Sequence, residues 1–285
     1  MSIQGKYFLL ILPLFLLSSM LHAETVSLET SKNVTATAEY ISGEPGKPLL
    51  ILIHGFLQTR SFSTVDRLFT ALQDSGFPVL APTLSLGISE RAQALPCESI
   101  HTHSLGDDSR EIGQWVDWAS KQGHEDIVLI GHSAGSVNIT AYLATGSHPV
   151  VKKTILISLT HYGPGRPAAL ETEEHARLAR TMIEQGDDGL ERFALAFCKD
   201  YVSTAKNFLS YYDWSDQAII KAINKKAPEN YIIIGSNDNR IKQQWISSLQ
   251  QANAKVIVID GASHFFDQAY EFDLLEKVEE LLEPE

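Results

Sequence analysis

Short apolar runs recur along the chain, and each is followed by histidine, glycine, serine or aspartate. They cover residues 48–53, 126–130, 153–157, 231–234 and 254–259. Runs of this length that are rich in isoleucine, leucine and valine are typical of buried strands. We therefore expect a strand at each run, with a polar loop beginning where the strand ends.

The connection between the runs at 153–157 and 231–234 is unusually long. It contains about seventy residues, far more than one helical crossover needs. We expect a cap insertion here, over about residues 162–226. Within it, apolar side chains recur with helical spacing at 178–183 and again at 190–197. The spacing predicts a cap built of short helices.

The second half of this insertion is rich in aromatic residues. Ligand sites are concave and largely apolar, so some of these rings are candidates for the wall of a substrate pocket. The alternative, which we favour for most of them, is that they pack the interior of the cap. The residues are Phe193, Phe197, Tyr201, Phe208, Tyr211, Tyr212 and Trp214.

A G-x-S-x-G motif, Gly131-His-Ser-Ala-Gly135, directly follows the run at 126–130. A helix-compatible stretch runs from Ser136 to about Thr145. The order strand, sharp turn, helix is typical of a nucleophile elbow, in which flanking glycines let the turn close around the serine. We expect Ser133 to be a nucleophile held at the end of its strand.

A serine hydroxyl needs a base and an orienting acid to attack a substrate near neutral pH. His264 follows the run at 254–259, and Asp238 follows the run at 231–234, so both lie just past the end of an expected strand. We expect His264 to be the base and Asp238 the acid. Asp260 also ends a strand, but it lies only four positions before His264 and is poorly placed to orient it.

The segment His54-Gly-Phe-Leu57 follows the first long apolar run. A backbone N–H in this loop, together with the one after the nucleophile, is suited to stabilise an oxyanion. We expect these donors to be Phe56 and Ala134. His54, Leu57 and His161 are further candidates for substrate contact.

Each catalytic candidate has a structural alternative. Ser133 is compatible with an ordinary turn, Asp238 with an Asx-turn after a strand, and His264 with a hydrogen-bonded surface position. The three occur in the order serine, aspartate, histidine, which is the order of α/β-hydrolases. Order and strand context together favour the catalytic interpretation.

From about residue 49 to 280 the chain resembles the α/β-hydrolase superfamily, in its serine esterase and lipase branch. The resemblance rests on His54-Gly-Phe, the motif at 131–135, Asp238 and His264. It implies an α/β fold with a mostly parallel, eight-stranded sheet, helices on both faces and a helical cap before the acid-bearing strand. The first loop lacks the His-Gly-Gly-Gly run of some lipases and esterases.

These observations predict a serine hydrolase that cleaves carboxylic esters of modest size through an acyl-enzyme on Ser133. The expected partner is a small-molecule ester, and no cofactor is needed. Thioesterase, amidase and acyltransferase activities use similar residues and stay open as alternatives. A non-catalytic binding module of the same fold is a further alternative, against which the complete set of triad residues argues.

Length and charge are consistent with this interpretation. The chain has 285 residues, 44% of them apolar, which suits one α/β domain over residues 24–285 that includes the cap. The net charge is −12, and the most basic segments, Lys152-Lys153 and Lys225-Lys226, are isolated pairs. Nucleic-acid binding needs basic clusters, so no nucleic acid is expected as a partner. The sequence does not indicate an oligomeric state.

The N-terminus is typical of a secretory signal peptide over residues 1–23. Lys6 precedes the apolar run 8–17, and a short polar stretch ends at Ala23. Ten apolar residues are short for a membrane-spanning helix, which needs about 20. We expect cleavage after Ala23, export to the periplasm or the medium, and no stable membrane insertion afterwards. A retained N-terminal anchor is the alternative.

Cys97 and Cys198 are the only two cysteines, and an oxidising compartment would allow them to pair. We expect a disulfide that ties the cap to the body; two unpaired buried thiols are the alternative. A metal site is conceivable where His101-Thr-His103 precedes Asp107-Asp108. The sequence Asp108-Ser-Arg-Glu111 is better explained as a capping box with Asp108 as the N-cap. No metal is therefore expected.

Overall fold

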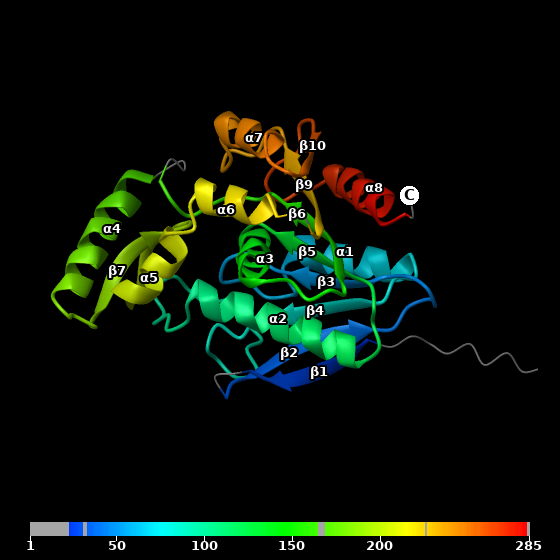
Figure 1. Cartoon of the computed structure of the whole chain (residues 1–285), viewed down its shortest axis with the longest axis horizontal. Coiled ribbons are helices and arrows are strands. Elements are labelled where there is room, and N and C mark those ends of the chain that lie inside the picture. Colours follow the sequence, from blue (N-terminus) through cyan, green and yellow to red (C-terminus); the bar gives the residue numbers. More distant parts are fainter. Residues whose placement is uncertain (1–22, 31–32, 165–168, 226, 284–285) are drawn as a thin grey trace, which may run out of the picture.

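The computed structural model describes residues 23–30, 33–164, 169–225 and 227–283. Within them a twisted central sheet has eight strands (Figure 1). From one edge to the other they are β1 (Glu24–Glu29), β2 (Thr35–Ile41), β4 (Val79–Thr83), β3 (Leu49–Ile53), β5 (Ile127–His132), β6 (Val151–Ile157), β9 (Glu229–Gly235) and β10 (Lys255–Ile259).

Most of this sheet is parallel. From β4 to β10 each strand runs parallel to its neighbours, and only β2 is antiparallel to both β1 and β4. The strands β3, β4 and β5 are buried along their whole length, as the continuous apolar runs predict. The predicted α/β fold with a mostly parallel sheet is confirmed.

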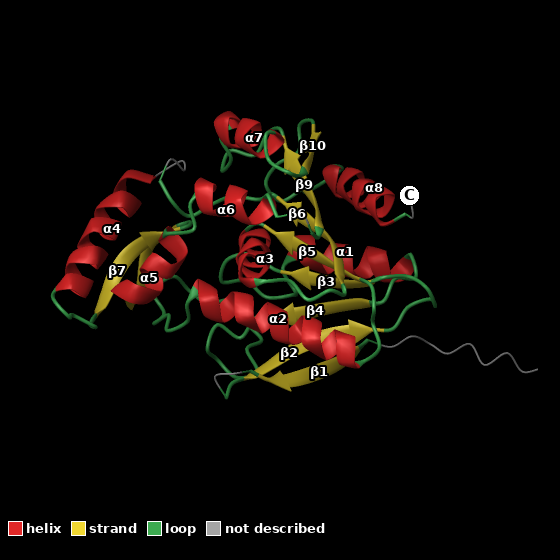
Figure 2. Ribbon diagram, viewed as in Figure 1, coloured by secondary structure: helices red, strands yellow, loops and turns green. Residues whose placement is uncertain are grey.

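Helices cover both faces of the sheet (Figure 2). On one face lie α2 (Leu105–Lys121), α3 (Ala134–Thr145), α6 (Asp216–Ile223) and α7 (Gln243–Gln250). On the other lie α1 (Ser63–Asp74) and α8 (Tyr270–Leu282). Helix α3 is buried over most of its surface, which places the elbow at its start in the centre of the molecule.

Helix α2 begins earlier than the sequence suggested. Ser104 is its N-cap and accepts a hydrogen bond from Asp107 N, while the Asp107 carboxylate accepts one from Ser104 N. The interpretation of Asp108 as the N-cap is therefore wrong. Leu105 is buried, so the helix must already have begun at that residue to place it against the core.

The segment between β6 and β9 forms a cap on one side of the molecule (Figure 1). Its first helix is α4 (Ala169–Glu184), and α6 leads back to the sheet. Between these helices lie a two-stranded antiparallel hairpin, β7 (Leu190–Leu195) and β8 (Cys198–Thr204), and then α5 (Ala205–Tyr212). A cap is present, but it is not purely helical.

The prediction of a helix over residues 190–197 is wrong. Leu190 is 49% exposed and Phe197 53% exposed, so they do not share a buried helical face with Phe193. Instead Phe193 pairs with Tyr201, and Leu195 with Cys198, across the hairpin. Pairing with a second strand decided the conformation, and the local spacing of apolar residues contains no information about that partner.

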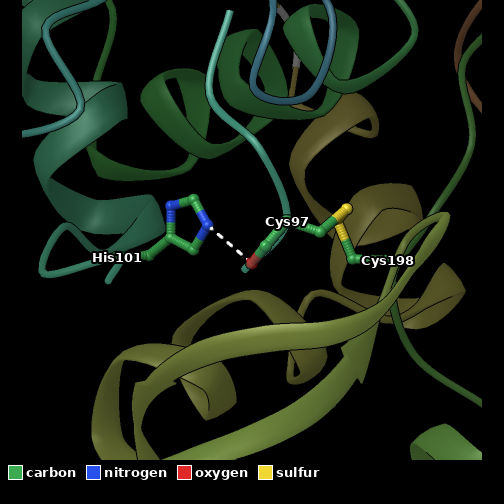
Figure 3. The surroundings of a disulfide bond; sticks show 3 residues. All are labelled: Cys97, His101 and Cys198. Carbon is green, nitrogen blue, oxygen red and sulfur yellow. Dashed lines mark hydrogen bonds between the residues drawn. A yellow bond between two sulfur atoms is a disulfide. The ribbon is translucent and has the colours of Figure 1, made fainter. Parts of the chain in front are cut away.

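Cys97 and Cys198 form a disulfide with a Cα–Cα distance of 5.4 Å (Figure 3). The predicted disulfide is thus present, and the alternative of two unpaired thiols is wrong. Beyond Cys97 the chain runs alongside β8: His101 N donates to Val202 O at 2.8 Å, and Ser203 Oγ donates to His101 O at 2.7 Å. The long loop after β4 is therefore attached to the cap by a covalent bond and by backbone contacts.

The predicted signal peptide covers residues 1–23, and its first 22 residues lie outside the described part of the chain. Strand β1 begins at Glu24, the residue after the predicted cleavage point. In the described ranges no helix combines the length and apolarity that crossing a membrane requires.

Candidate active site

Ser133 lies in a sharp turn between β5 and α3. Its backbone has φ 56° and ψ −118°, a conformation that residues other than glycine rarely adopt. A Cβ atom on Gly131 would lie 2.6 Å from Ser136 N, and one on Gly135 would lie 2.2 Å from Ile53 O. Both glycines of the motif are therefore required by close backbone contacts, as in a nucleophile elbow.

The three predicted triad residues lie together. His264 Nε2 is 2.9 Å from Ser133 Oγ, and His264 Nδ1 is 2.6 Å from Asp238 Oδ2. Asp238 is 5% exposed and His264 3% exposed, so water competes little for these hydrogen bonds. Asp260 lies elsewhere, exposed, where it accepts a hydrogen bond from Ser236 Oγ at 2.9 Å. The geometry favours Asp238 as the partner of the histidine.

The loop that carries His264 is held by its backbone carbonyl. Ser158 Oγ donates to His264 O at 2.8 Å, and His132 Nε2 donates to the same oxygen at 3.0 Å. Burial, with the nearby His264 charge second, lowers the pKa of His132 to about 3, so this ring is neutral at neutral pH. His132 and Ser158 thus hold the loop that carries His264, and no sequence pattern pointed to Ser158.

Both expected oxyanion donors lie beside the nucleophile. A Cβ atom on Gly55 would be 3.7 Å from Ser133 Cβ, so the backbone before Phe56 passes next to the serine. Ala134 is the first residue of α3, and its N–H therefore has no acceptor within the helix. The positive end of the helix dipole at this position also favours a developing negative charge.

His54 and Leu57 belong to this loop, but both are buried and neither lines the cavity described below. The His54 ring is occupied by its backbone contacts: Nδ1 donates to Gly55 O at 2.9 Å, and Nε2 accepts from Leu84 N at 3.0 Å. Burial, with the Arg91 charge second, lowers the pKa of His54 to about 3. His54 holds the loop in place as a neutral side chain.

Arg91 also holds this loop in place through hydrogen bonds to backbone carbonyls. Its Nη2 donates to Gln58 O at 2.6 Å, and its Nε donates to Leu84 O at 2.8 Å. The carboxylate of Glu111 accepts from Ser85 N at 2.9 Å and from Ser85 Oγ at 2.5 Å, one residue further along. This buried polar cluster was not apparent from the sequence, because its members come from separate loops and from α2.

A cavity of about 540 Å³ opens onto Ser133 and His264. Its walls are rich in aromatic rings and come from the oxyanion loop, from the turn before α1, from the elbow, from the hairpin tip and from the loops after β6, β9 and β10. The side chains that line it include Phe56, Phe62, Thr160, Tyr162, Ala196, Phe197, Asn239, Arg240 and Phe265. Of the cap aromatics considered for the pocket, Phe197 lines the cavity. Phe193 and Phe208 stack on each other inside the cap, whereas Tyr201 and Tyr211 pack between the cap and the body.

His161 lies next to this cavity and not in its wall. It lines a smaller hollow of about 110 Å³ together with Arg240 and Trp245, and its ring meets Trp245 edge to face at 5.2 Å. Its predicted contact with the substrate therefore depends on a ligand large enough to reach that hollow.

Of the side chains considered for a metal site, those of His101, His103 and Asp108 make contacts with cap residues instead. Tyr211 Oη lies 2.6 Å from both Asp108 Oδ2 and His103 Nδ1, and the ring of His101 stacks on Tyr201 with a centroid distance of 4.3 Å. Among the residues that the structure describes, no group of three or more histidine, cysteine, aspartate or glutamate side chains is arranged to hold a metal ion.

Comparison with known proteins agrees with this architecture. A model of the alpha/beta hydrolase family matches residues 50–272. Over 97 residues, 34% of this chain, the sequence is 35% identical to epoxide hydrolase A of Mycobacterium tuberculosis. That match spans only 27% of the length of the relative.

Several solved structures share the fold across nearly the whole chain. Est1E from Butyrivibrio proteoclasticus superimposes with a TM-score of 0.64 at 19% identity, covering 90% of this chain and 97% of its own. An esterase of Pyrococcus furiosus, Pf2001, gives a TM-score of 0.61 at 16% identity, covering 92% and 91%. The alpha/beta hydrolase GrgF from Penicillium sp. sh18 gives 0.68 at 12% identity, covering 92% and 98%. Since the family model matches well over half of the chain, the protein belongs to the alpha/beta hydrolase family.

Proposed function

We propose that this protein is a serine hydrolase that cleaves carboxylic esters of modest size through an acyl-enzyme on Ser133. One observation carries the proposal: hydrogen bonds link Asp238 through His264 to Ser133 Oγ, and that oxygen faces an aromatic-lined cavity. Family membership supports hydrolysis. A cavity of about 540 Å³ is within the range typical of small-molecule sites.

In the first half of the reaction Ser133 Oγ attacks the ester carbonyl carbon, and His264 Nε2 takes the hydroxyl proton. The carbonyl oxygen becomes an oxyanion, which accepts hydrogen bonds from the N–H groups of Phe56 and Ala134. When the tetrahedral intermediate collapses, His264 returns the proton to the leaving alcohol. Asp238 keeps the imidazole in the required tautomer and stabilises the imidazolium.

In the second half a water molecule takes the place of the alcohol. His264 removes its proton while its oxygen attacks the acyl carbon, and the same two N–H groups hold the new oxyanion. Collapse releases the carboxylic acid and returns the proton to Ser133 Oγ. The cycle uses only side chains and backbone groups of this chain, and no step needs a cofactor.

Epoxide opening, the activity named for the partly matching relative, is not proposed for this chain. Attack of Ser133 on an epoxide carbon would leave an ether between the enzyme and the substrate. An ether has no carbonyl for water to attack, so the oxyanion donors at Phe56 and Ala134 would have nothing to stabilise. Thioesters, amides and acyl transfer go through the same acyl-enzyme and stay as alternatives within the proposal.

The experiment that tests the proposal is labelling with a fluorophosphonate, followed by a substrate series. The wild-type protein should be labelled at Ser133, and Ser133→Ala should not. Ester, thioester and amide substrates with the same acyl group should then be compared, and the ester series extended from acetyl to long acyl chains. Absence of labelling, together with no turnover of any of these substrates by the wild type, would favour the non-catalytic binding module.

We also propose that the protein is exported to the periplasm or secreted. The Cys97–Cys198 disulfide supports this, because such bonds persist in oxidising compartments. Cleavage after Ala23 would leave β1 complete and a mature chain of net charge −13, since Lys6 is the only charged residue removed. Mass spectrometry of protein expressed with export should find an N-terminus at or near Glu24. Quantitative retention of Met1 in the membrane fraction would instead indicate an anchor.

A further inference from the structure

The described residues of the cavity wall include one permanently charged side chain. Among the described residues that line it, Arg240 is the only arginine or lysine, and none is an aspartate or glutamate. The chain as a whole has 35 acidic and 23 basic residues. The chain as a whole therefore has more carboxylates than cations, whereas the described cavity wall has one cation and no carboxylate.

Among the described residues the guanidinium of Arg240 has no anionic partner. In the described part of the chain no carboxylate oxygen lies within 4.0 Å of it. Its Cζ instead lies 4.8 Å from the ring centroid of Phe265, and its backbone N donates to Asp238 Oδ1 at 2.9 Å. Stacking and the backbone hydrogen bond hold Arg240 at the wall while its N–H donors stay available to a ligand.

Arg240 lies on the same side of the cavity as His264. The ring of Phe265 meets the ring of His264 edge to face at 5.1 Å, so the sequence of contacts runs from Arg240 through Phe265 to His264. In the proposed mechanism His264 Nε2 delivers the proton to the departing alcohol, which must therefore lie next to this ring. The alcohol half of the substrate is the half that extends toward Arg240.

The opposite wall is apolar. Phe56, on the oxyanion loop, contacts Tyr162 at 5.9 Å and Phe197 at 5.7 Å between ring centroids. These rings offer no formal charge to an acyl group. Aromatic rings thus line the described cavity wall on both sides of Ser133, whereas its cation lies only on the side of His264.

We propose that Arg240 is a specificity-determining residue and that the preferred substrates are esters whose alcohol half carries a carboxylate. A guanidinium binds a carboxylate through two parallel N–H···O hydrogen bonds, which fixes orientation as well as charge. This inference rests on the proposed function, because it assigns one half of an ester to one side of the site.

A matched pair of substrates tests the inference. 4-Carboxyphenyl butanoate and 4-carbamoylphenyl butanoate have the same acyl group and leaving groups of nearly equal size, but only the first is an anion. The wild type should hydrolyse the anionic ester with the higher kcat/KM. Arg240→Gln should lower the ratio of the two kcat/KM values by about five- to tenfold. Arg240→Lys should keep part of the preference, because it keeps the charge without the planar pair of donors.

The control is Lys242→Gln, which removes a charge from the same loop but from outside the main cavity. It should leave the ratio unchanged. If Arg240→Gln disturbs His264, the kcat/KM values of both esters fall by the same factor, because both use the same triad. The ratio of the two values is then unaffected by that disturbance. An unchanged ratio in Arg240→Gln would overturn the inference, and so would an equal loss in Lys242→Gln, which would indicate only long-range electrostatics.

Binding to Ser133→Ala separates this inference from the proposed function. Calorimetry should show tighter binding of 4-carboxyphenyl butanoate than of the carbamoyl ester, and Arg240→Gln in the same background should abolish the difference. If the wild type hydrolyses neither ester but this difference is present, the proposed function fails and Arg240 recognition stands. If both esters are hydrolysed without any dependence on Arg240, the function stands and the inference fails.

Discussion

At the scale of single residues, Ser133 combines exposure to the cavity with an unfavourable backbone conformation. A non-glycine residue at φ 56° and ψ −118° costs about 1–3 kcal/mol. The surrounding chain compensates: Ser133 N donates to Ile157 O at 2.9 Å, and Ser136 Oγ donates to Gly131 O at 2.7 Å. The nucleophile is therefore held by its neighbours and does not depend on substrate for its position.

Substitutions in the triad should lower the turnover of esters and leave the protein folded. Ser133→Ala and His264→Ala should each lower ester kcat by several orders of magnitude without unfolding the protein. Asp238→Asn should also be severe, since an amide favours the wrong tautomer of His264. Steady-state kinetics and circular dichroism measure the two effects.

Asp260→Asn is the matched control for the acid. Asp260 lies in the same part of the sheet edge but accepts its hydrogen bond from Ser236, so this variant should keep near-normal turnover. An inactive Asp260→Asn with an active Asp238→Asn would reassign the acid. Near-normal turnover by Ser133→Ala would contradict the whole mechanism.

At the scale of elements, the β7–β8 hairpin connects the disulfide with the site. Cys198 begins β8 directly after Ala196 and Phe197, which both line the cavity. On the other side of the bond, Cys97 belongs to the long loop after β4, where His101 Nε2 lies 3.2 Å from Cys97 O (Figure 3). The disulfide therefore anchors the tip of the hairpin at the place where it contributes a wall to the cavity.

Breaking this disulfide should change selectivity as well as stability. Closure of a loop of 101 residues restricts the unfolded chain, and the entropy model assigns about 4–5 kcal/mol to it. Reduction or Cys198→Ser should lower the melting temperature and loosen Phe197 over Ser133, so small and bulky esters should respond unequally. Calorimetry and kcat/KM for acetyl and longer acyl esters measure these effects.

Phe197→Leu, with the disulfide intact, is the control for this prediction. It alters the same wall without touching the bond, so it should shift selectivity with little loss of stability. If removal of the disulfide slows all esters equally, the bond stabilises the fold and has no part in shaping the site.

At the scale of the whole molecule, buried titratable groups should make stability depend on pH. Burial lowers the pKa of His54 and of His132 to about 3, and that of His101 to about 4, from an ordinary value of 6.5. Burial raises the pKa of Glu111 from 4.5 to about 7. The buried histidines and Glu111 therefore change the stability of the fold in opposite directions as the pH falls.

As pH falls below 6.5, the unfolded chain protonates its histidines while the folded chain keeps these three neutral. The unfolded state then binds more protons, so stability falls by up to about 1.4 kcal/mol per pH unit for each histidine. Glu111 opposes this loss between pH 7 and 4.5, because the folded state takes up a proton there that the unfolded state does not. Urea unfolding should show stability decreasing from pH 6.5 to 4.5.

Glu111→Gln isolates the opposing contribution. The variant should lose stability more steeply than the wild type as pH falls from 7 to 4.5, because the proton uptake by the folded state is gone. Parallel stability curves for the two proteins over this range would show that Glu111 does not titrate there.

The sequence alone predicted the strands β3, β5, β6, β9 and β10, because short runs rich in isoleucine, leucine and valine that end in polar loops are typical of strands in a parallel sheet. It also identified Ser133, Asp238 and His264, since each follows such a run and parallel strands bring their carboxyl ends to one edge. Only the tertiary structure brought His264 within hydrogen-bonding distance of both partners and separated Asp260 from them.

The tertiary structure also decided features that depend on distant partners. Residues 190–195 form a strand because they pair with β8, although their local spacing suits a helix. Arg240 and Phe265 enter the cavity wall because two loops, separate in sequence, meet beside His264. Local patterns report burial and local conformation, whereas the neighbours of a loop residue are determined by contacts that form only when the whole chain has folded.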